Sequence, residues 1–310
     1  ADFNGDGRLD IYVANDGMPN FLYVNRGESV APRFENQSTL LGAAVNFQGK
    51  AEASMGVACG DYNGDGWMDL FLTHFYAETN TLYQNVDGAS FRDETISAGL
   101  GPSSRSKLGF GTEFFDPDND GRLDLIVTNG HIDDFSYKPG SPPYAMLPQL
   151  YRNQGGRFED VSRWAGAFFQ KPEIGRGLAV GDWDNDGDID AAISHQKTAS
   201  ALVRNDTETE HRGIFVRLIG GPKSNRSAIH TIIEAEGEGV QVPLVREVIG
   251  GGSFQSHSDR RVHIGLGEAE PLERLKITWP SGKMDEWGNI KPGHYIAVEK
   301  QFLLPSPTGH

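Results

Sequence analysis

Four acidic loops share one nine-residue pattern that could bind a hard cation. In each loop, Asp or Asn occupies positions 1, 3, 5 and 9, and Gly occupies position 6. Calcium takes about six to eight oxygen ligands, and alternate residues of a curled loop can direct oxygens at one centre while Gly permits the turn. The pattern therefore predicts calcium sites. Their ligands are Asp2, Asn4, Asp6 and Asp10; Asp61, Asn63, Asp65 and Asp69; Asp116, Asp118, Asp120 and Asp124; and Asp182, Asp184, Asp186 and Asp190.

The start of this pattern is similar to an EF-hand loop, but its end is different. An EF-hand has a bidentate Glu at position 12 and flanking helices. Apolar, partly β-branched residues follow each loop here, which predicts strands, so the Asp at position 9 is expected to close each site. One such cluster could be a solvated turn, but four aligned copies favour a metal. The predicted sites also include the seventh residues, Arg8, Trp67, Arg122 and Asp188.

Charge is distributed unevenly along the 310 residues, whose net charge is −15. Residues 1–210 hold 16 Lys and Arg against 32 Asp and Glu, whereas residues 211–310 hold 12 against 11. Without a cation the loop carboxylates repel one another, and with one they hold strands together. An acidic surface argues against nucleic acid as a partner, because that affinity depends on neutralising phosphates. No apolar run approaches the length of a membrane span, about 18 residues.

The single cysteine, Cys59, excludes an internal disulfide and a thiolate metal site. Because Cys59 lies in an apolar run, we expect it to be a buried small hydrophobe. The nine histidines show no spacing typical of a transition-metal or catalytic site. His74 and His195 occupy the repeat position of Asn15 and Asn129, which indicates a recurring hydrogen-bonding role at a strand end. No catalytic residue is predicted.

The loops recur at a period that is typical of propeller blades. They begin at residues 2, 61, 116 and 182. A strand follows each loop, and a second strand reads FLYVN, TLYQN, QLYRN or ALVRN. A third strand carries an aromatic residue, and a fourth, Gly-rich run leads into the next loop. Four short strands per unit predict blades of a β-propeller.

A second, smaller β domain is predicted after a polar linker, residues 206–212. Six segments read as strands: 213–220, 228–236, 240–248, 261–267, 273–279 and 294–300. Leu275, Ile277 and Trp279 are expected on one face of their strand. The run 250–252 is Gly-Gly-Gly, and it predicts a bulge or a close backbone contact. Residues 301–310 are expected to be a flexible tail.

These phrases resemble one family closely. Six segments are similar to FG-GAP/VCBS-repeat propellers of the cartilage-acidic-protein group, which have a C-terminal ASPIC/UnbV domain. These segments are YVANDGMPNFLYVN, LGFGTEFFDPDNDGRLDLIVTNGHIDD, RGLAVGDWDNDGDIDAAIS, KSNRSAI, HIGLG and ITWPSG. The resemblance implies an all-β fold with calcium-binding blades at 1–210, a β-sandwich-like ASPIC/UnbV domain at 211–300 and the tail at 301–310. Because such propellers have about seven blades, we expect this chain to be the C-terminal part of a longer protein rather than a closed four-bladed ring.

An insertion in the third unit forms a candidate ligand loop. Residues 131–148 mix polar and aromatic side chains with four prolines, which favours an ordered surface feature. Blade packing and ligand binding are both open for this segment. The residues predicted to contact a ligand or a further cation are His131, Asp133, Asp134, Tyr137 and Tyr144.

Two functions are compatible with the sequence. The first is a secreted, calcium-stabilised module, extracellular or periplasmic, that binds a protein or glycan partner or associates with itself, for adhesion or assembly. The alternative is a calcium-dependent enzyme or accessory protein of natural-product biosynthesis, which the UnbV branch of the resemblance implies. Up to four Ca²⁺ ions are expected in either case. A deep pocket with convergent polar groups would favour the alternative.

Overall fold

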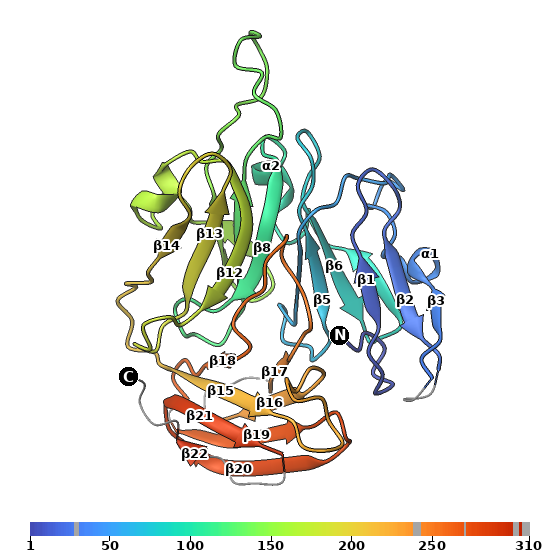
Figure 1. Cartoon of the computed structure of the whole chain (residues 1–310), viewed down its shortest axis with the longest axis vertical. Helices are drawn as coiled ribbons and strands as arrows, with labels where there is room; N and C mark the ends of the chain where they lie inside the picture. Colours follow the sequence, from blue (N-terminus) through green and yellow to red (C-terminus); the bar gives the residue numbers. More distant parts are fainter. Residues whose placement is uncertain (28–30, 238–242, 270, 300–303, 306–310) are drawn as a thin grey trace.

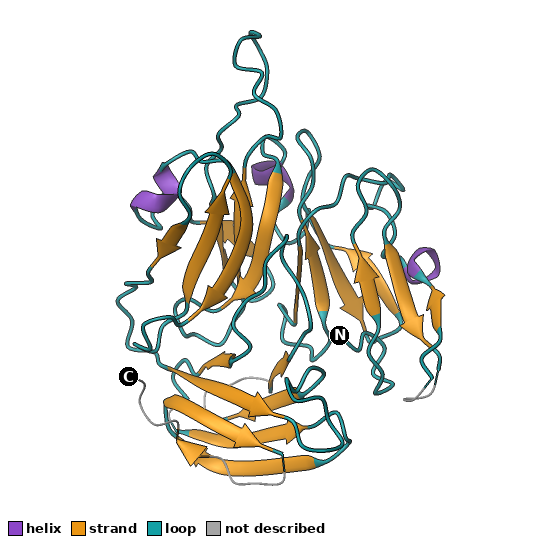
Figure 2. Cartoon of the chain, viewed as in Figure 1, coloured by secondary structure: helices purple, strands orange, loops and turns teal. Residues whose placement is uncertain are grey.

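The computed structural model describes residues 1–27, 31–237, 243–269, 271–299 and 304–305. Four antiparallel sheets stand side by side in the upper part of the molecule, and two further sheets form a sandwich below them (Figure 1; Figure 2). The fold is therefore nearly all β, as predicted.

Each of the four upper sheets is a simple meander in which sequential strands are neighbours. The first contains β1 (Ile11–Val13), β2 (Phe21–Asn25) and β3 (Phe34–Asn36), and the second contains β4 (Val57–Gly60), β5 (Asp69–Leu72), β6 (Thr81–Val86) and β7 (Ser90–Asp93). The third contains β8 (Gly109–Phe115), β9 (Asp124–Asn129), β10 (Gln149–Asn153) and β11 (Phe158–Asp160), and the fourth contains β12 (Gly175–Gly181), β13 (Asp190–His195) and β14 (Ala201–Val203). Short helices α1 (Ser38–Leu41), α2 (Gly101–Ser104) and the 3₁₀ helix η1 (Ala167–Gln170) lie in the connections.

In the second, third and fourth sheets, the Gly-rich run forms the first strand rather than the last. It pairs with the strand after the acidic loop, with Gly60 opposite Asp69 and Gly181 opposite Asp190. The structural blade is therefore offset by one strand from the loop-to-loop unit read in the sequence. The glycines let the innermost strands approach closely: a Cβ on Gly111 would lie 2.6 Å from the carbonyl oxygen of Arg176 in β12.

Hydrophobic cores fill the spaces between successive sheets. Phe71, Phe114 and Tyr151, all at most 8 % exposed, belong to one core between the second and third sheets. Ile126 and Leu178 belong to the core between the third and fourth sheets. Alternate side chains of a strand point to opposite faces, so a strand packed on both faces is buried throughout, as β9 is, with Leu125, Ile126 and Val127 at its centre. This packing of sheet on sheet is what sets the loops at the sheet ends in register with one another.

The C-terminal sandwich has two four-stranded sheets. One has the order β18 (Val262–Gly265), β15 (Gly213–Ile219), β21 (Gly293–Val298) and β22 (Leu304–Pro305), and the other has the order β17 (Leu244–Glu247), β16 (Ile232–Glu236), β19 (Leu272–Thr278) and β20 (Met284–Ile290). All six predicted strands are present. Leu275, Ile277 and Trp279 are at most 1 % exposed and lie in the sandwich core, as expected.

Two strands of the sandwich were not predicted. The β20 sequence, MDEWGNI, is polar because most of its side chains face solvent, so its apolar pattern is weak. The short β22 pairs with β21 through Leu304 and Ile296 and falls within the predicted tail. The rest of the segment 301–310 lies outside the described residues.

An arm of the sandwich, residues 249–260, rises between the blades (Figure 1). It connects β17 to β18 and runs along the innermost strands β4, β8 and β12. The backbone N–H of Ser253 donates to the carbonyl of Val57 at 2.6 Å, and that of Asp259 donates to the carbonyl of Val180 at 2.9 Å. The Phe254 ring lies 4.9 Å from the Phe110 ring. The Gly-Gly-Gly run, residues 250–252, therefore lies at the base of this arm, next to the close backbone contact between Ser253 and Val57.

Candidate metal centres

The acidic loops lie at the end of the blades that faces the sandwich. In the second, third and fourth blades, the loop joins the innermost strand to the next strand, and the first loop leads into β1. Because all four loops sit at the same end of aligned sheets, their carboxylates form one acidic belt. This belt is what the sandwich contacts.

The first Asp of each loop organises the turn. One oxygen of Asp2, Asp61, Asp116 and Asp182 accepts the backbone N–H of the loop Gly at 2.7, 2.9, 2.8 and 3.3 Å. These glycines, Gly7, Gly66, Gly121 and Gly187, all have positive φ angles, between 81° and 103°. A side chain is strained in that conformation, so Gly at position 6 follows from the turn.

The ninth Asp fastens the loop to the sheet. One oxygen of Asp10, Asp69, Asp124 and Asp190 accepts the backbone N–H of Asn25, Asn85, Asn153 and Asn205 at 2.8, 2.7, 2.7 and 2.8 Å. These asparagines are the last residues of the FLYVN, TLYQN, QLYRN and ALVRN phrases. The ninth Asp therefore holds the loop against the third strand of its own blade, which makes it the structural end of each loop.

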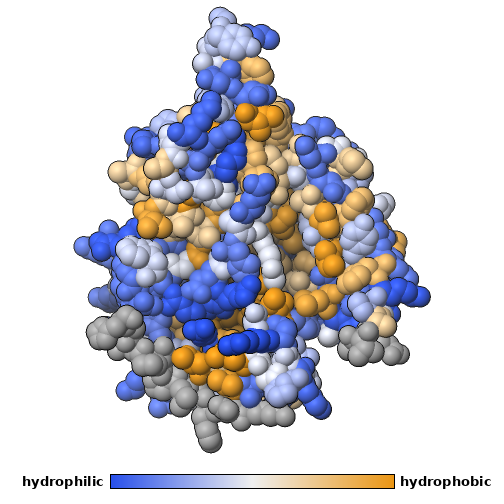
Figure 3. Space-filling model, viewed as in Figure 1, coloured by the Kyte–Doolittle hydropathy of each residue, from blue (hydrophilic) through white to orange (hydrophobic). Residues whose placement is uncertain are grey.

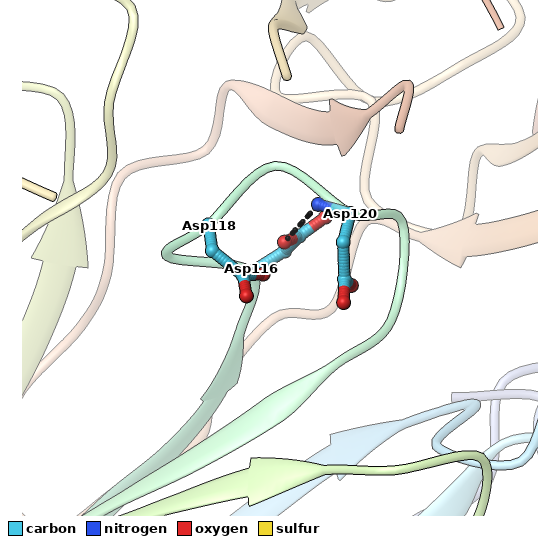
Figure 4. Close-up of side chains that lie close together, drawn as sticks. All are labelled: Asp116, Asp118 and Asp120. Atoms are coloured by element: carbon cyan, nitrogen blue, oxygen red, sulfur yellow. Dashed lines mark hydrogen bonds between the residues drawn. The ribbon is translucent and has the colours of Figure 1, made fainter. Parts of the chain in front are cut away.

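The third and fourth loops bring three carboxylates together. Oxygen atoms of Asp116, Asp118 and Asp120 all lie within 4.8 Å of one another (Figure 4), and so do those of Asp182, Asp184 and Asp190. A buried oxygen in each group, Oδ1 of Asp118 and Oδ1 of Asp182, has no hydrogen-bond partner. A buried carboxylate oxygen without a donor is costly unless a cation meets it. The residues of these two loops therefore fit a calcium ion.

Burial opposes ionisation of these carboxylates when no cation is present. It raises the pKa of Asp69 and Asp124 to about 8 and the pKa of Asp116 to about 7. Neighbouring loop carboxylates raise the same pKa values further, while backbone donors lower them. A bound divalent cation would reverse this balance, because it stabilises the ionised form.

The first two loops form less concentrated groups. They have Asn at position 3, which leaves one carboxylate fewer. Their fifth Asp is engaged within the loop, as Asp120 is with Arg122 in the third loop: Arg8 pairs with Asp6 at 2.5 Å, and Asn63 Nδ2 donates to Asp65 at 2.8 Å. Among the residues that the structure describes, neither loop brings three carboxylate oxygens within the same distance of one another. A cation here would have to displace these local contacts.

The side chains of the seventh residues contact neighbouring elements, although Arg8 and Arg122 also pair with Asp6 and Asp120 of their own loops. Nε of Arg8 donates to the carbonyl of Asn25 at 2.9 Å, and Asp188 accepts from Asn119 of the neighbouring blade at 2.9 Å. Arg122 contacts its own strand in the same way as Arg8, and the Trp67 ring packs on Gly5 of the first loop. For Arg8, Trp67 and Arg122, whose side chains carry no oxygen, the ligand atom that remains to be predicted is the backbone carbonyl.

A link between neighbouring blades was missed in the sequence, although its signal was visible. The asparagines of the second, third and fourth repeated phrases donate their side-chain amides to the second residue of the preceding blade's loop. Asn85 reaches the carbonyl of Phe3 at 2.8 Å, and Asn153 reaches that of Tyr62 at 2.7 Å. Asn205 reaches Pro117 at 2.7 Å. The invariance of this asparagine within the four phrases could have indicated such a role.

The histidines at strand ends make the hydrogen bonds that the repeat position suggested. Asn15 and Asn129 donate side-chain amides to the carbonyls of Pro19 and Leu147, and Nδ1 of His195 contacts that of Ala199 at 2.9 Å. His74 is buried and contacts Thr81 instead. Burial lowers the His74 pKa to about 3, so the ring is neutral.

Cys59 lies in β4 beside a hydrophobic core, where burial raises its pKa to about 12. A thiol held in its protonated form is a poor nucleophile and a poor metal ligand. This agrees with the expected role of a small apolar residue.

The candidate ligand loop projects from the far end of the blades as a long excursion between β9 and β10 (Figure 1). His131 is buried at its base, with its ring against Phe75 and Phe135 and its Nδ1 2.9 Å from the carbonyl of Asp133. Asp133 and Asp134 are exposed, and Tyr137 is 79 % exposed at a distance from that base. Lys197 covers the Tyr144 ring at 4.6 Å. The five residues therefore divide between packing and exposure: His131 also donates its backbone N–H to the carbonyl of Tyr144 at 2.8 Å, whereas Asp133, Asp134 and Tyr137 are exposed. A ligand at this loop stays a prediction.

Fold and loops together define a β-propeller segment joined to a β-sandwich. A family model described as FG-GAP-like repeat matches residues 2–72, 61–127 and 116–193, and a model described as ASPIC and UnbV matches residues 221–302. The chain belongs to the family of FG-GAP-like repeat proteins with an ASPIC and UnbV domain, as the sequence phrases indicated.

Similar proteins are longer than this chain. Cartilage acidic protein 1 from Xenopus tropicalis is 26% identical over 284 residues, which cover 89% of this chain and 40% of the relative. The Homo sapiens protein is 24% identical over 304 residues, 96% of this chain and 42% of the relative. A solved Agrocybe aegerita lectin structure aligns at a TM-score of 0.33 and 19% identity, over 66% of this chain and 51% of that chain, which is too distant to carry an argument. None of the described helices is long and apolar enough to cross a membrane.

Proposed function

We propose that this chain is part of an extracellular binding module whose blades and sandwich are held together by calcium. The observation that carries the proposal is the unpartnered, buried oxygen of Asp118 and of Asp182 within a group of three carboxylates. Calcium sites at these loops would fill where the calcium concentration is near millimolar, which is the condition outside cells. The similarity to cartilage acidic proteins supports an extracellular location.

The face of the blades opposite the sandwich is the proposed binding surface, here called the distal face. It is formed by the β1–β2, β3–β4, β5–β6, β7–β8, β9–β10 and β11–β12 connections. Large hydrophobic side chains between 47 % and 79 % exposed lie on these connections: Met18, Phe47, Ile96, Ile132, Tyr137 and Trp164. Exposed aromatic residues on connections that a rigid sheet positions are typical of recognition surfaces.

The cavity at the centre of the blades is too small to support the alternative of an enzyme there. The cavity between the innermost strands and the arm has a volume of about 150 Å³, and Glu113, Arg246 and His263 are among its lining residues. Small-molecule sites are usually about 300–1,000 Å³. This space is also filled on one side by the arm, so a substrate would have to displace part of the fold.

A binding assay on immobilised matrix proteins and a glycan array tests the proposal. In 2 mM calcium, roughly the extracellular range in which such weak sites fill, we expect the chain to bind at least one surface. Tyr137→Ser/Trp164→Ser should weaken that binding, and chelator should abolish it. Met284→Ser removes an equally exposed apolar residue from the sandwich and serves as the control. Equal binding by the double variant and the wild type would place the surface elsewhere.

A further inference from the structure

A basic cleft on the sandwich is the strongest unassigned feature of the molecule. It lies where the arm returns to β18 and has a volume of about 560 Å³. Its walls carry four arginines from three segments of the chain: Arg217, Arg226, Arg260 and Arg261. In a chain of net charge −15, four like charges converging on one concavity repel one another unless an anion joins them.

Only one of the four arginines is neutralised in the part of the chain that the structure describes. Arg261 pairs with Asp259 at 2.5 Å and also donates to Asn185 at 2.7 Å, so it belongs to the contact between sandwich and blades. Arg260 donates to the neutral hydroxyl of Ser227 at 3.0 Å. Arg217 and Arg226 have exposed side chains and form no ion pair with any described carboxylate. Among the described residues, therefore, three positive charges face the cleft without a counter-charge.

The backbone beneath these three arginines is fixed. Arg217 projects from β15, where its neighbours Val216 and Leu218 are buried in the sandwich core. The backbone carbonyl of Arg226 accepts the N–H of Gly220 at 3.3 Å, which closes the turn after β15. Arg260 follows Asp259, the arm residue bonded to Val180. Binding groups on a fixed backbone lose less entropy when a ligand arrives.

We propose that this cleft binds the sulfate or phosphate monoester group of a small ligand such as a sugar ester. A guanidinium presents a planar fork of N–H donors that matches two oxygens of a tetrahedral oxyanion. The Ser227 hydroxyl adds a neutral donor, and the half-buried Ile219 supplies an apolar wall for the body of the ligand. Nucleic acid is disfavoured, because the acidic loops adjoin the cleft and would repel an extended phosphate backbone. The inference rests on the proposed binding function and names the chemistry of one ligand.

Isothermal titration calorimetry of the whole chain tests this inference. The titrants are sodium sulfate, glucosamine 6-sulfate and glucose 6-phosphate, in calcium-containing buffer of low ionic strength. We expect saturable binding of sulfate and of at least one ester, and a preference between the esters assigns the group. Arg217→Gln/Arg226→Gln should weaken binding at least tenfold, because each arginine lost removes charge-assisted hydrogen bonds. Arg105→Gln, at an exposed arginine of the propeller, should bind like the wild type.

Two results would overturn the inference. One is the absence of saturable binding to the wild type, and the other is equal affinity of the double variant and the wild type. Melting curves of both chains ensure that a loss of binding is not a loss of folding, and Arg260→Lys, which keeps the charge but removes the planar fork, should also weaken binding. Failure here leaves the distal-face assay unaffected, because that assay uses different residues and a different readout.

Discussion

At the scale of single residues, Asn153 connects the acidic loop of its own blade, the acidic loop of the preceding blade and the turn after β10. Asn153 is fully buried, and its backbone N–H holds Asp124 of its own loop. Its side-chain amide donates to the carbonyls of Tyr62 and Leu123 at 2.7 and 2.9 Å. Its side-chain carbonyl accepts the N–H of Gly156 at 2.7 Å. The residue is therefore a fixed joint between two acidic loops.

We expect Asn153→Ala to lower the free energy of unfolding by about 2–3 kcal/mol, because it leaves buried backbone groups without partners. Chemical denaturation in calcium measures the change. Gln154→Ala, at an exposed neighbour outside the joint, should change it by less than about 0.5 kcal/mol. A similar, small effect of both substitutions would show that the amide bonds do not hold the blades together.

The exposed carboxylates of the projecting loop should contribute little to stability. Asp133→Asn/Asp134→Asn is expected to leave the free energy of unfolding within about 0.5 kcal/mol of the wild type. Thermal melting in calcium measures this. A large loss would mean that the loop contains a structural cation site, which the exposed positions of both side chains argue against.

At the scale of elements, the arm and the sandwich contact the belt of acidic loops at several points. The arm places Ser258 Oγ 2.9 Å from the buried Glu113 of β8. On the sandwich, Arg246 donates to the carbonyl of Gly121 at 3.0 Å, and His294 lies 3.3 Å from Asp182. Any cation that orders the loops would therefore also order the interface between blades and sandwich.

Glu113 should make stability depend on pH. Burial raises its pKa to about 8, above the unfolded value, so its contribution is present at low pH and lost as pH rises towards 8. Glu113→Gln keeps the shape without the charge. Its free energy of unfolding relative to the wild type should rise by about 1 kcal/mol or more between pH 5 and pH 8. Denaturation of both chains in calcium at each pH measures this, and parallel pH profiles would contradict it.

The sequence predicted local elements much better than contacts between distant ones. The acidic loops and their strands repeat at short range, so Asp61 to Asp69 could be read as one unit. The blade is offset from the repeat read in the sequence because the strand before each acidic loop pairs with the strand after that loop. A single repeat does not reveal this pairing. The arm was read only as a Gly-rich irregularity, because its partners Val57 and Val180 are far away along the chain. The packing of the candidate ligand loop could not be predicted for the same reason, because the His131 ring is buried against Phe75, which belongs to another blade.

At the scale of the whole molecule, the open row of blades exposes edges that a closed ring would cover. Neither β1 nor β14 has a second neighbour in its sheet. Ile11 of β1 is 46 % exposed and Leu202 of β14 is 69 % exposed. Hydrophobic side chains also gather over the blades on the right of Figure 3. Such edges favour association with another chain or another segment.

We expect the recombinant 310-residue chain to dimerise or aggregate in calcium. Size-exclusion chromatography with light scattering measures its mass as a function of concentration. Lys at both edge positions, in Ile11→Lys/Leu202→Lys, should shift the chain towards the monomer, because charge on an edge opposes strand pairing. A monodisperse monomer of the wild type at all concentrations would contradict the prediction.

The most direct test of the central claim is a melting curve with chelator, with Mg²⁺ and with millimolar Ca²⁺. A ligand that binds only the native state adds about 2.7 kcal/mol per site at a hundredfold excess over Kd, so Ca²⁺ should raise the melting temperature strongly. Mg²⁺ should do so weakly, because it prefers a smaller octahedral shell. Asp186→Ala should lose part of the calcium effect, whereas Asp16→Ala, at an exposed Asp outside the loops, should keep it all. If chelator leaves the wild-type melting temperature unchanged, calcium does not hold this fold together.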